Sequence, residues 1–289
     1  MTEISLRGQN KTAVFLGGTQ GMGAACARLL AKLGCSDIVL VGRSEIKGEE
    51  QVKKILEINN EVKVVFVKAD MGTLKGMRTA AEDIISVVEK IDYLVMTQGG
   101  TPSMTHLENE DGNDPGFSVQ GISRFVLPYL LIKSSALNPG ATILSICNVG
   151  QTLPTLTVDD LNLKQNNRGV LGFFMDESKR DSCVIDGVFL EGQIRYPEYR
   201  WVHQFPGLVR NETFDVDKFP FPINWVFWMA LPFSPNPDGF APNPINLLLD
   251  KDKYTDHFYN RKNKVIQPGD WAKNGDNRKA LWEKLVGMV

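Results

Sequence analysis

Short runs of apolar residues alternate along the chain with longer segments in which apolar positions recur every three or four residues. The short runs predict buried strands, and the longer segments predict amphipathic helices. We expect strands at 12–17, 37–42, 62–69, 93–97, 142–147 and 200–205. We expect helices between them, at about 21–34, 45–59, 73–89, 116–136 and 175–191.

Several of these strands are apolar at consecutive positions, such as 38–41, rather than at alternate ones. Consecutive apolar residues are typical of a strand that is covered on both faces. Strands that alternate with helices predict right-handed crossovers and a doubly wound parallel α/β sheet of the Rossmann type. No linker divides the chain, so we expect residues 1–289 to form a single domain.

The last third of the chain differs in composition. Residues 214–244 are dense in proline and aromatic side chains, and the prolines exclude one long helix there, although 223–231 is compatible with a short one. We expect a C-terminal flap at about 212–260. Three interpretations stay open: apolar cover that completes the fold, a lid over a hydrophobic substrate, and a shallow membrane contact.

Composition narrows the class of protein. The 32 lysines and arginines nearly balance the 34 acidic residues and form no basic stripe, so we expect no nucleic-acid partner. The four cysteines form no CxxC pair and no metal-like spacing with the three histidines, which favours reduced thiols and no metal site. Without a signal-like start or an apolar stretch of about 18 residues, a cytoplasmic protein with no transmembrane segment is expected.

A glycine-rich turn follows the first predicted strand and precedes the first predicted helix. At such a turn, backbone N–H groups and the positive end of the helix dipole form an anion site with little side-chain bulk, suited to a diphosphate. The order of strand, glycine turn and helix is typical of a dinucleotide site. We therefore assign to cofactor binding Gly17, Thr19, Gln20, Gly21, Met22 and Gly23.

The end of the second strand bears on the choice of nucleotide, because it meets the adenosine ribose in such sites. Gly42 occupies the slot in which a carboxylate would bind the ribose 2′-hydroxyl, and Arg43 follows with a fork that matches phosphate oxygens. We favour an NADP(H) pocket, with a solvated surface arginine as the alternative. Asp70, after the third strand, is either an acceptor for the adenine amino group or a helix cap.

These features resemble the short-chain dehydrogenase/reductase family, in particular its retinol-dehydrogenase-like and fungal biosynthetic members, over most of the chain. The family's glycine turn corresponds to residues 16–23, its Asn-Asn-Ala-Gly segment to 96–99 and its Pro-Gly pair to 206–207. The resemblance implies an oxidoreductase whose cofactor site includes Asp70, Met71, Gly99, Pro206 and Gly207. It leaves a homo-oligomer open, because many members are dimers or tetramers.

Aligned with the family's catalytic positions, this sequence keeps the lysine but lacks both the serine and the tyrosine. The serine that polarises the substrate carbonyl corresponds to Asn148, and the lysine that holds the cofactor ribose corresponds to Lys179. The proton-donating tyrosine, four residues before the lysine, corresponds to Met175, and the family's helix-four asparagine corresponds to Gln120. No tyrosine occurs between residues 130 and 195, so shifting the alignment does not restore one.

Methionine has no proton to donate, so the acid that would protonate an alkoxide is missing. We expect Asn148 to donate its amide to the substrate and Lys179 to bind the ribose and stabilise negative charge. The alternatives are a turn residue and a solvated lysine. Replacement acids compatible with the sequence are Asp160, Asp176, Glu177, Tyr196, Tyr199 and His203.

The sequence favours an atypical NADPH-dependent reductase of a hydrophobic small molecule in a biosynthetic pathway. The reducible group would be C=O, an activated C=C or an iminium. An iminium or an activated enone suits a site without an acid better than a plain ketone does, because hydride addition to an iminium gives a neutral amine directly. Two alternatives stay open: a non-redox isomerase or cyclase on the same fold, and a nucleotide-binding pseudoenzyme.

Overall fold

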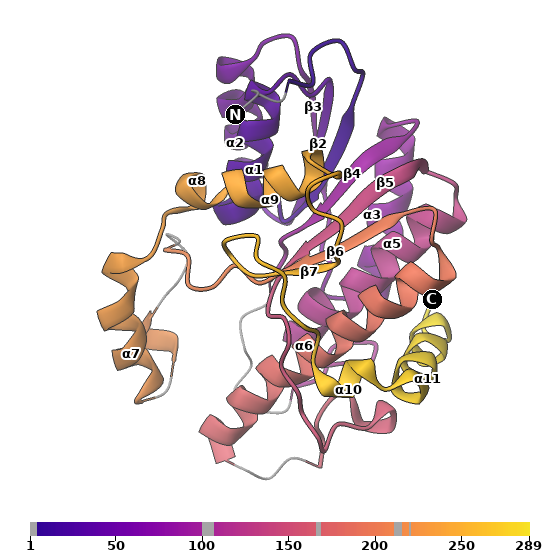
Figure 1. The fold of residues 1–289 in the computed structure, drawn as a ribbon, viewed down its shortest axis with the longest axis vertical. Helices are drawn as coiled ribbons and strands as arrows, with labels where there is room; N and C mark the ends of the chain where they lie inside the picture. The colour runs from indigo at the N-terminus through magenta and orange to yellow at the C-terminus, as the bar shows by residue number, and fades with distance from the viewer. Residues whose placement is uncertain (1–4, 100–106, 166–168, 211–215, 220) are drawn as a thin grey trace.

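The fold is built on one seven-stranded sheet in the order β3-β2-β1-β4-β5-β6-β7, in which all neighbouring strands are parallel (Figure 1). The computed structural model describes residues 5–99, 107–165, 169–210, 216–219 and 221–289. The strands are β1 (Thr12–Leu16), β2 (Asp37–Gly42), β3 (Lys63–Lys68), β4 (Ile91–Met96), β5 (Leu137–Ile146), β6 (Arg200–Gln204) and β7 (Phe258–Tyr259).

Helices cover both faces of this sheet (Figure 1). On one face lie α1 (Gly21–Lys32), α2 (Glu45–Ile58), α8 (Pro237–Phe240) and α9 (Pro242–Leu249). On the other lie α3 (Leu74–Val87), α4 (Pro115–Phe117), α5 (Ser123–Lys133), α6 (Gly169–Arg195), α10 (Asp270–Lys273) and α11 (Gly275–Val286).

The strand sequences explain this two-sided burial. In β1, Ala13 and Phe15 belong to the apolar core beneath α1, whereas Val14 and Leu16 belong to the core on the opposite face. Successive strand side chains point to opposite faces, so a continuous apolar run serves both cores. The doubly wound parallel sheet expected from the sequence is confirmed.

The helix expected over 116–136 is interrupted near its start, so the prediction of one continuous helix is wrong there. A π-helical turn, η1 (Ser118–Ile122), separates α4 from α5. Inside this turn the carbonyl of Gln120 accepts a hydrogen bond of 2.6 Å from Nη1 of the buried Arg124. A side-chain donor of this kind satisfies a carbonyl that the widened turn displaces from the ordinary helical ladder.

Two further elements differ from the predicted ones. α6 begins at Gly169 and ends at Arg195, several residues beyond the predicted helix at both ends. A seventh strand, β7, contains only two residues, Phe258 and Tyr259, which is too short to leave a periodic pattern in the sequence.

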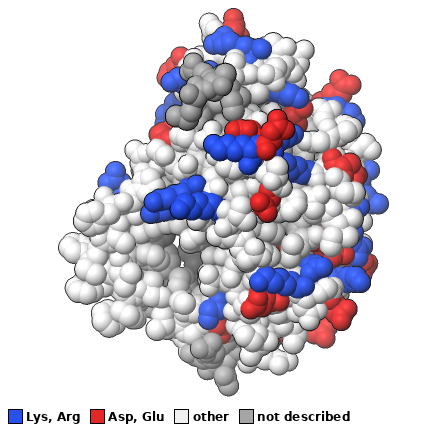
Figure 2. Space-filling view, viewed as in Figure 1, with Lys and Arg blue, Asp and Glu red and all other residues white. Residues whose placement is uncertain are grey.

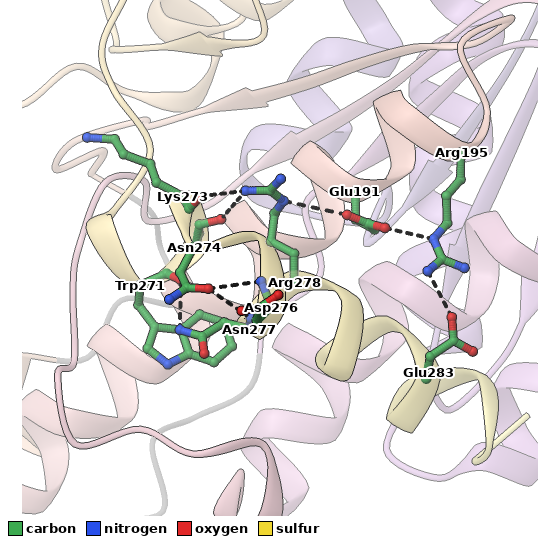
Figure 3. A network of polar contacts seen from close by, with 10 residues as sticks. Glu191, Arg195, Trp271, Lys273, Asn274, Asp276, Asn277, Arg278 and Glu283 are labelled. Carbon is green, nitrogen blue, oxygen red and sulfur yellow. Dashed lines mark hydrogen bonds and ion pairs between the residues drawn. The ribbon is translucent and has the colours of Figure 1, made fainter.

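The C-terminal helix α11 is held against α6 by a buried carboxylate, as Figure 3 shows. Glu191 of α6 accepts a hydrogen bond of 2.9 Å from Nε of Arg195 and lies 3.5 Å from Nε of Arg278. Arg195 also reaches Glu283 at 2.8 Å and lies over the ring of Trp282. The end of the chain is therefore part of the folded body and packs beside the central helix of the site.

The segment after β6 leaves the body and returns to it (Figure 1). Its described elements are the short helical turn η3 (Val216–Lys218), the helix α7 (Ile223–Ala230) and the turn η4 (Leu231–Phe233). α7 corresponds to the short helix compatible with 223–231, and it packs on η3 and η4 of its own segment. In Figure 1 it projects away from the sheet.

Candidate functional site

The carboxyl ends of the strands meet at one edge of the sheet. β1 lies between β2 and β4, and the chain leaving β1 enters a helix on one face while the chain leaving β4 reaches α5 on the other. In an open parallel sheet such a reversal leaves a crevice in which ligands bind. Every predicted site residue outside α6 lies on a segment that follows one of the first six strands.

The glycine turn after β1 has a shape that side chains would fill. Gly17 and Gly21 both have positive φ angles, +81° and +57°, which L-residues rarely adopt. A Cβ on Gly17 would lie 2.7 Å from the backbone nitrogen of Gln98, and a Cβ on Gly23 would collide with Oγ1 of Thr97. The turn is thus packed closely against the end of β4, and its backbone is free of side-chain cover.

The first turn of α1 follows this loop directly. Gln20 is its N-cap residue, and its side chain makes no capping hydrogen bond. The N–H groups of the first turn have no partner within a helix, so at this end they are available to an anion. Thr19 and Met22, which are half-buried, flank the cap. The residues at this turn therefore fit the diphosphate of a dinucleotide.

The end of β2 is shaped by a contact that the sequence did not reveal. A Cβ on Gly42 would lie 2.8 Å from Cγ2 of Thr19, so an acidic side chain does not fit in this slot unless the Thr19 side chain moves. The next residue, Arg43, is exposed. Nearby, Nζ of Lys47 donates a 2.6 Å hydrogen bond to Oε1 of Gln20. The slot at position 42 therefore holds no carboxylate, and Lys47 contacts the glycine turn through Gln20.

A polar cavity of about 790 Å³ opens beside the glycine turn, between α1, α2 and α8. Four cationic and two acidic side chains line it, which gives its wall an excess of positive charge. The charged lining residues are Arg28, Lys47, Lys54, Arg210, Glu50 and Asp238.

Three further predicted cofactor residues lie along the same edge. Asp70 is exposed after β3, where one carboxylate oxygen accepts the N–H of Gly72 at 2.9 Å, while Thr73 caps α3. Met71 is buried in the core. Gly99 follows β4, and a Cβ there would lie 3.6 Å from Oε1 of Gln120. The structure therefore brings the end of β4 next to the π-helical turn.

The Pro206–Gly207 pair follows β6 at the same edge. Gly207 has a φ of +66°, and a Cβ there would approach Cδ of Arg261 to 3.1 Å. Glycine is therefore favoured at this bend both by its backbone conformation and by the room available.

The structure places the predicted catalytic residues together. Asn148 follows β5, and its Nδ2 donates a 3.0 Å hydrogen bond to Oγ of Ser178 on α6. Lys179 comes next on the helix and is half-buried, and Met175 lies one turn earlier with 42% of its surface exposed. Ser178 was not predicted, because only its spatial position beside Asn148 distinguishes it from other helical serines.

The sequence-predicted replacement acids are scattered. His203 is fully buried on β6, where its Nδ1 lies 2.9 Å from Oδ1 of Asp186. Asp160 accepts two backbone N–H groups in its own loop, and the ring of Tyr196 packs against Trp282 near α11. Tyr199 lies beyond the end of α6, just before β6. These four residues are committed to the core or to turns.

Asp176 and Glu177 are buried in the first half of α6, and Glu177 lines a second cavity of about 120 Å³. This cavity lies between α6, the π-helical turn and the flap. It is lined by Gly116, Gln120, Phe174, Glu177, Ser178, Arg180, Asp181 and Phe219. It contains no tyrosine among its described lining residues.

Asp181 is, after Ser178, a further residue of this cavity that sequence reasoning missed. One of its oxygens accepts Nε2 of Gln120 at 3.0 Å, and the other accepts Nε of Arg180 at 2.9 Å. Burial raises the pKa of Asp181, and the Arg180 guanidinium opposes this rise. Arg180 itself stacks over Phe117. No periodicity marks Asp181 in the sequence, because α6 buries charged residues on several sides.

Arg124 supports the floor of the site. Its Nε donates to Oγ of Ser145 at 2.9 Å, and its Nη2 donates to the carbonyl of Ile146 at 3.3 Å. Its Nη1 donates to the carbonyl of Gln120 in the π-helical turn, so all three guanidinium nitrogens of Arg124 have acceptors. Burial lowers the pKa of Arg124 from its ordinary value. Arg124 therefore ties Gln120 to the end of β5, just before Asn148.

Two features are absent from the described part of the chain. No three His, Cys, Asp or Glu side chains gather there in a way that would hold a metal ion. None of the described helices combines the length and the apolar character that crossing a bilayer requires.

Known proteins resemble this chain both in sequence and in fold. Residues 11–149 match the sequence profile of the short chain dehydrogenase family. Oxidoreductase AN1596 of Emericella nidulans is 26% identical over 232 residues, which are 78% of this chain and 67% of the relative. Retinol dehydrogenase 12 of Mus musculus is 24% identical over 160 residues, 55% of this chain and 49% of the relative.

The fold itself matches solved structures. A short-chain dehydrogenase/reductase from Serratia marcescens superimposes with a TM-score of 0.62 at 18% identity, over 90% of this chain and 99% of that one. The chain spans about two thirds of the first relative above and about half of the second. Together, the profile match over residues 11–149 and the relatives support membership of the short-chain dehydrogenase/reductase family, whose members bind a nicotinamide cofactor, NAD or NADP.

Proposed function

We propose that the chain is an NADPH-dependent reductase of a hydrophobic small molecule. The observation that carries the nucleotide choice is the slot at the end of β2. Thr19 fills the space that a carboxylate at position 42 would need, and Arg43 and Lys47 stand beside it. A guanidinium and an ammonium bind a 2′-phosphate well and gain little from an unmodified ribose.

When bound, NADPH would supply a hydride to the substrate. The residues suited to hold it are those of the glycine turn and α1 for the diphosphate, Arg43 for the 2′-phosphate, and Lys179 for the nicotinamide ribose. Asp70 and Met71 would border the adenine, and Gly99, Pro206 and Gly207 would border the nicotinamide. The close packing of Gly17 and Gly23 fits such a ligand, because added side chains would fill the cradle.

At the chemical end, the amide of Asn148 is suited to donate to a substrate oxygen or to orient a polar group. Lys179 contributes positive charge, and Met175 contributes none of the proton transfer expected of a tyrosine. Two acidic side chains, Glu177 and Asp181, and the cation Arg180 line the adjoining cavity. An iminium needs no proton donor, because hydride addition gives a neutral amine, so we place it ahead of a plain ketone.

The hydrophobic character of the substrate is inferred from two sources. Phe174 and Phe219 line the smaller cavity, with ring centroids 5.6 Å apart. Relatives are named retinol dehydrogenase and polyprenol dehydrogenase, after apolar alcohols. A fungal relative is named short chain dehydrogenase/reductase dpchH. These support a lipophilic substrate and a biosynthetic role.

One observation favours a second candidate. Methionine at position 175 removes the usual acid, so turnover without net reduction, as an isomerase or cyclase, is compatible with the same cavity. In that case the nucleotide would serve as a scaffold. The two functions differ in whether NADPH is consumed.

The nucleotide choice is tested by titrating the protein with NADPH and NADH by calorimetry. We expect NADPH to bind more tightly, and Arg43→Ala to weaken NADPH binding by about 1–3 kcal/mol while leaving NADH binding nearly unchanged. Lys47→Ala should act in the same direction with a smaller effect. Lys53→Ala is the matched control, because Lys53 is exposed on the same helix and does not line the cavity. Equal losses for both nucleotides with Arg43→Ala would show that Arg43 does not read the phosphate.

A further inference from the structure

The most exposed apolar surface of the described chain lies on the flap. We define the apolar lobe as residues 221–233, which contain α7 and η4. Four of its large aromatic side chains are between 60% and 89% exposed: Phe221, Trp225, Trp228 and Phe233. No charged residue occurs from position 219 to position 237. Figure 2 shows the lobe as a white bulge without acidic side chains on the face in view, bordered by lysine or arginine.

α7 is apolar on two faces, and only one of them packs against other described residues of the chain. Phe227 lies on the half-buried inner face, and its ring is 4.9 Å from that of Phe219. Phe219 in turn contacts Phe174 of α6, which anchors the lobe to the cavity described above. The outer face carries Trp225, Val226, Trp228 and Met229, all exposed.

A helix on the surface of a water-soluble domain ordinarily presents polar side chains outward. Contiguous exposed apolar patches of this kind mark interaction sites. We therefore expect the outer face of α7 to contact a binding partner. The chemistry of its side chains indicates which class of partner this is. Protein interfaces surround their apolar core with a hydrogen-bonding, partly charged rim. Here the outer side chains offer only indole N–H groups as strong donors.

A phospholipid surface does not require a hydrogen-bonding rim around the apolar contact. Tryptophan and phenylalanine are the residues that settle at the boundary between head groups and acyl chains, with nearby cations favouring anionic lipids. We propose that the outer face of the apolar lobe docks on the surface of a phospholipid membrane. The lobe is too short to span the bilayer, so the contact is a shallow, interfacial one.

This docking would place the mouth of the smaller cavity next to the acyl region. Phe219 belongs both to the lining of the cavity and to the inner packing of the lobe. A lipophilic substrate would then pass from the bilayer to the cavity with little exposure to water. This consequence rests on the proposed function, whereas the docking itself does not, because it is independent of nucleotide and of turnover.

Vesicle sedimentation of the full chain tests the docking, using phosphatidylcholine vesicles with and without phosphatidylserine. Quenching by brominated acyl chains adds a local readout. Trp225 and Trp228 are the exposed tryptophans, whereas Trp201, Trp271 and Trp282 are buried, so quenching by lipid reports on the lobe. We expect the wild-type protein to sediment with vesicles and its fluorescence to be quenched, without added nucleotide.

The double substitution Trp225→Ser/Trp228→Ser should weaken vesicle binding at least about tenfold. Trp225→Phe/Trp228→Phe keeps the apolar surface, so it should retain binding and lose the quenching. Ile46→Ser, which changes an isolated exposed isoleucine on α2, is the matched control and should bind as the wild type does. Near-ultraviolet circular dichroism from the buried tryptophans checks that each variant is folded.

Three results would overturn the proposal. The first is a wild-type protein that stays in the supernatant with unquenched fluorescence, and the second is a serine variant that binds vesicles as tightly as the wild type. The third is a dimer in light scattering that the serine substitutions dissociate, in the absence of vesicle binding. That third result would assign the lobe to self-association. Because nucleotide titration is measured separately, each of these failures leaves the proposed reductase function to its own test.

Discussion

Met175 lies one helical turn before Lys179 on α6, at the place where the family carries its proton donor. Its side chain is partly exposed, so the position accepts a larger residue. A phenol there would lie near an ammonium, which favours the ionised form of the phenol and lowers its pKa. If position 175 is the proton-donor position, as we propose, a single substitution would restore the acid.

Met175→Tyr is therefore expected to raise the rate of NADPH-dependent ketone reduction about tenfold or more, because a positioned acid assists alkoxide protonation. Steady-state rates with a ketone substrate measure this. Met175→Phe has similar bulk without the hydroxyl and should leave both the rate and nucleotide binding nearly unchanged. An equal gain from both variants would show that bulk, not acidity, is limiting at this position.

His203 and Asp186 form a buried pair whose titration should be visible in stability. Burial holds the pKa of His203 below its usual value of 6.5, although the hydrogen bond and charge of Asp186 oppose this. At a pH between the native and the unfolded pKa, the unfolded chain therefore binds a proton at His203, whereas the native protein does not. This stabilising contribution is fully present above the unfolded pKa and is lost as the pH falls through the native pKa.

We therefore expect the free energy of unfolding to fall between about pH 7 and pH 5 more steeply in the wild type than in His203→Gln. Glutamine keeps a donor for Asp186 and does not titrate. Urea denaturation of both proteins at each pH gives the difference between their free energies of unfolding. The contributions of the other titrating groups largely cancel in this difference. Parallel pH profiles for the two proteins would refute a neutral buried His203.

At the scale of elements, α6 links the site to the end of the chain. Ser178 and Asp181 line the smaller cavity, and Glu191 holds α11 at the other end of the helix (Figure 3). Removing one partner of a buried ion pair leaves the other uncompensated, which costs several kcal/mol, whereas exposed pairs contribute little.

Glu191→Gln should therefore destabilise the protein by about 3 kcal/mol and increase hydrogen exchange in 275–286. Glu283→Gln is the matched control, since Glu283 contacts the same Arg195 from an exposed position, and its effect should stay within about 0.5 kcal/mol. Denaturant titration and hydrogen exchange of both variants measure this. Similar losses for the two variants would contradict a special role for the buried carboxylate.

The elements that the sequence predicted well are those with a strong local signal. The strands of the sheet centre and α1 to α3 follow apolar periodicity and flanking glycines, and the glycine turn follows from its place between them. The π-helical turn escaped prediction because it depends on Arg124 reaching Gln120 and the end of β5. Asp181 and Ser178 escaped because only contacts between elements identify them.

For the molecule as a whole, the two halves of the proposed site differ in how they relate to the family. In our proposal, the glycine turn, the crowded slot at Gly42 and the cations beside it form a nucleotide cradle that prefers NADPH. At the proposed chemical end, methionine stands at the position that we align with the family's tyrosine, next to a small cavity lined by charged and aromatic side chains. An exposed apolar lobe adjoins that cavity. Together these features favour reduction of a lipophilic substrate that supplies its own positive charge or proton.

The most direct test of this account is deuteride transfer from NADPH labelled at C4 of the nicotinamide, with hydrophobic iminium and carbonyl compounds as substrates. Mass spectrometry of the product shows where the label goes. The account predicts a product that carries one deuterium and an equal amount of oxidised NADP. An unlabelled product, formed while the nucleotide stays reduced, would contradict it and assign the cavity to isomerisation or cyclisation.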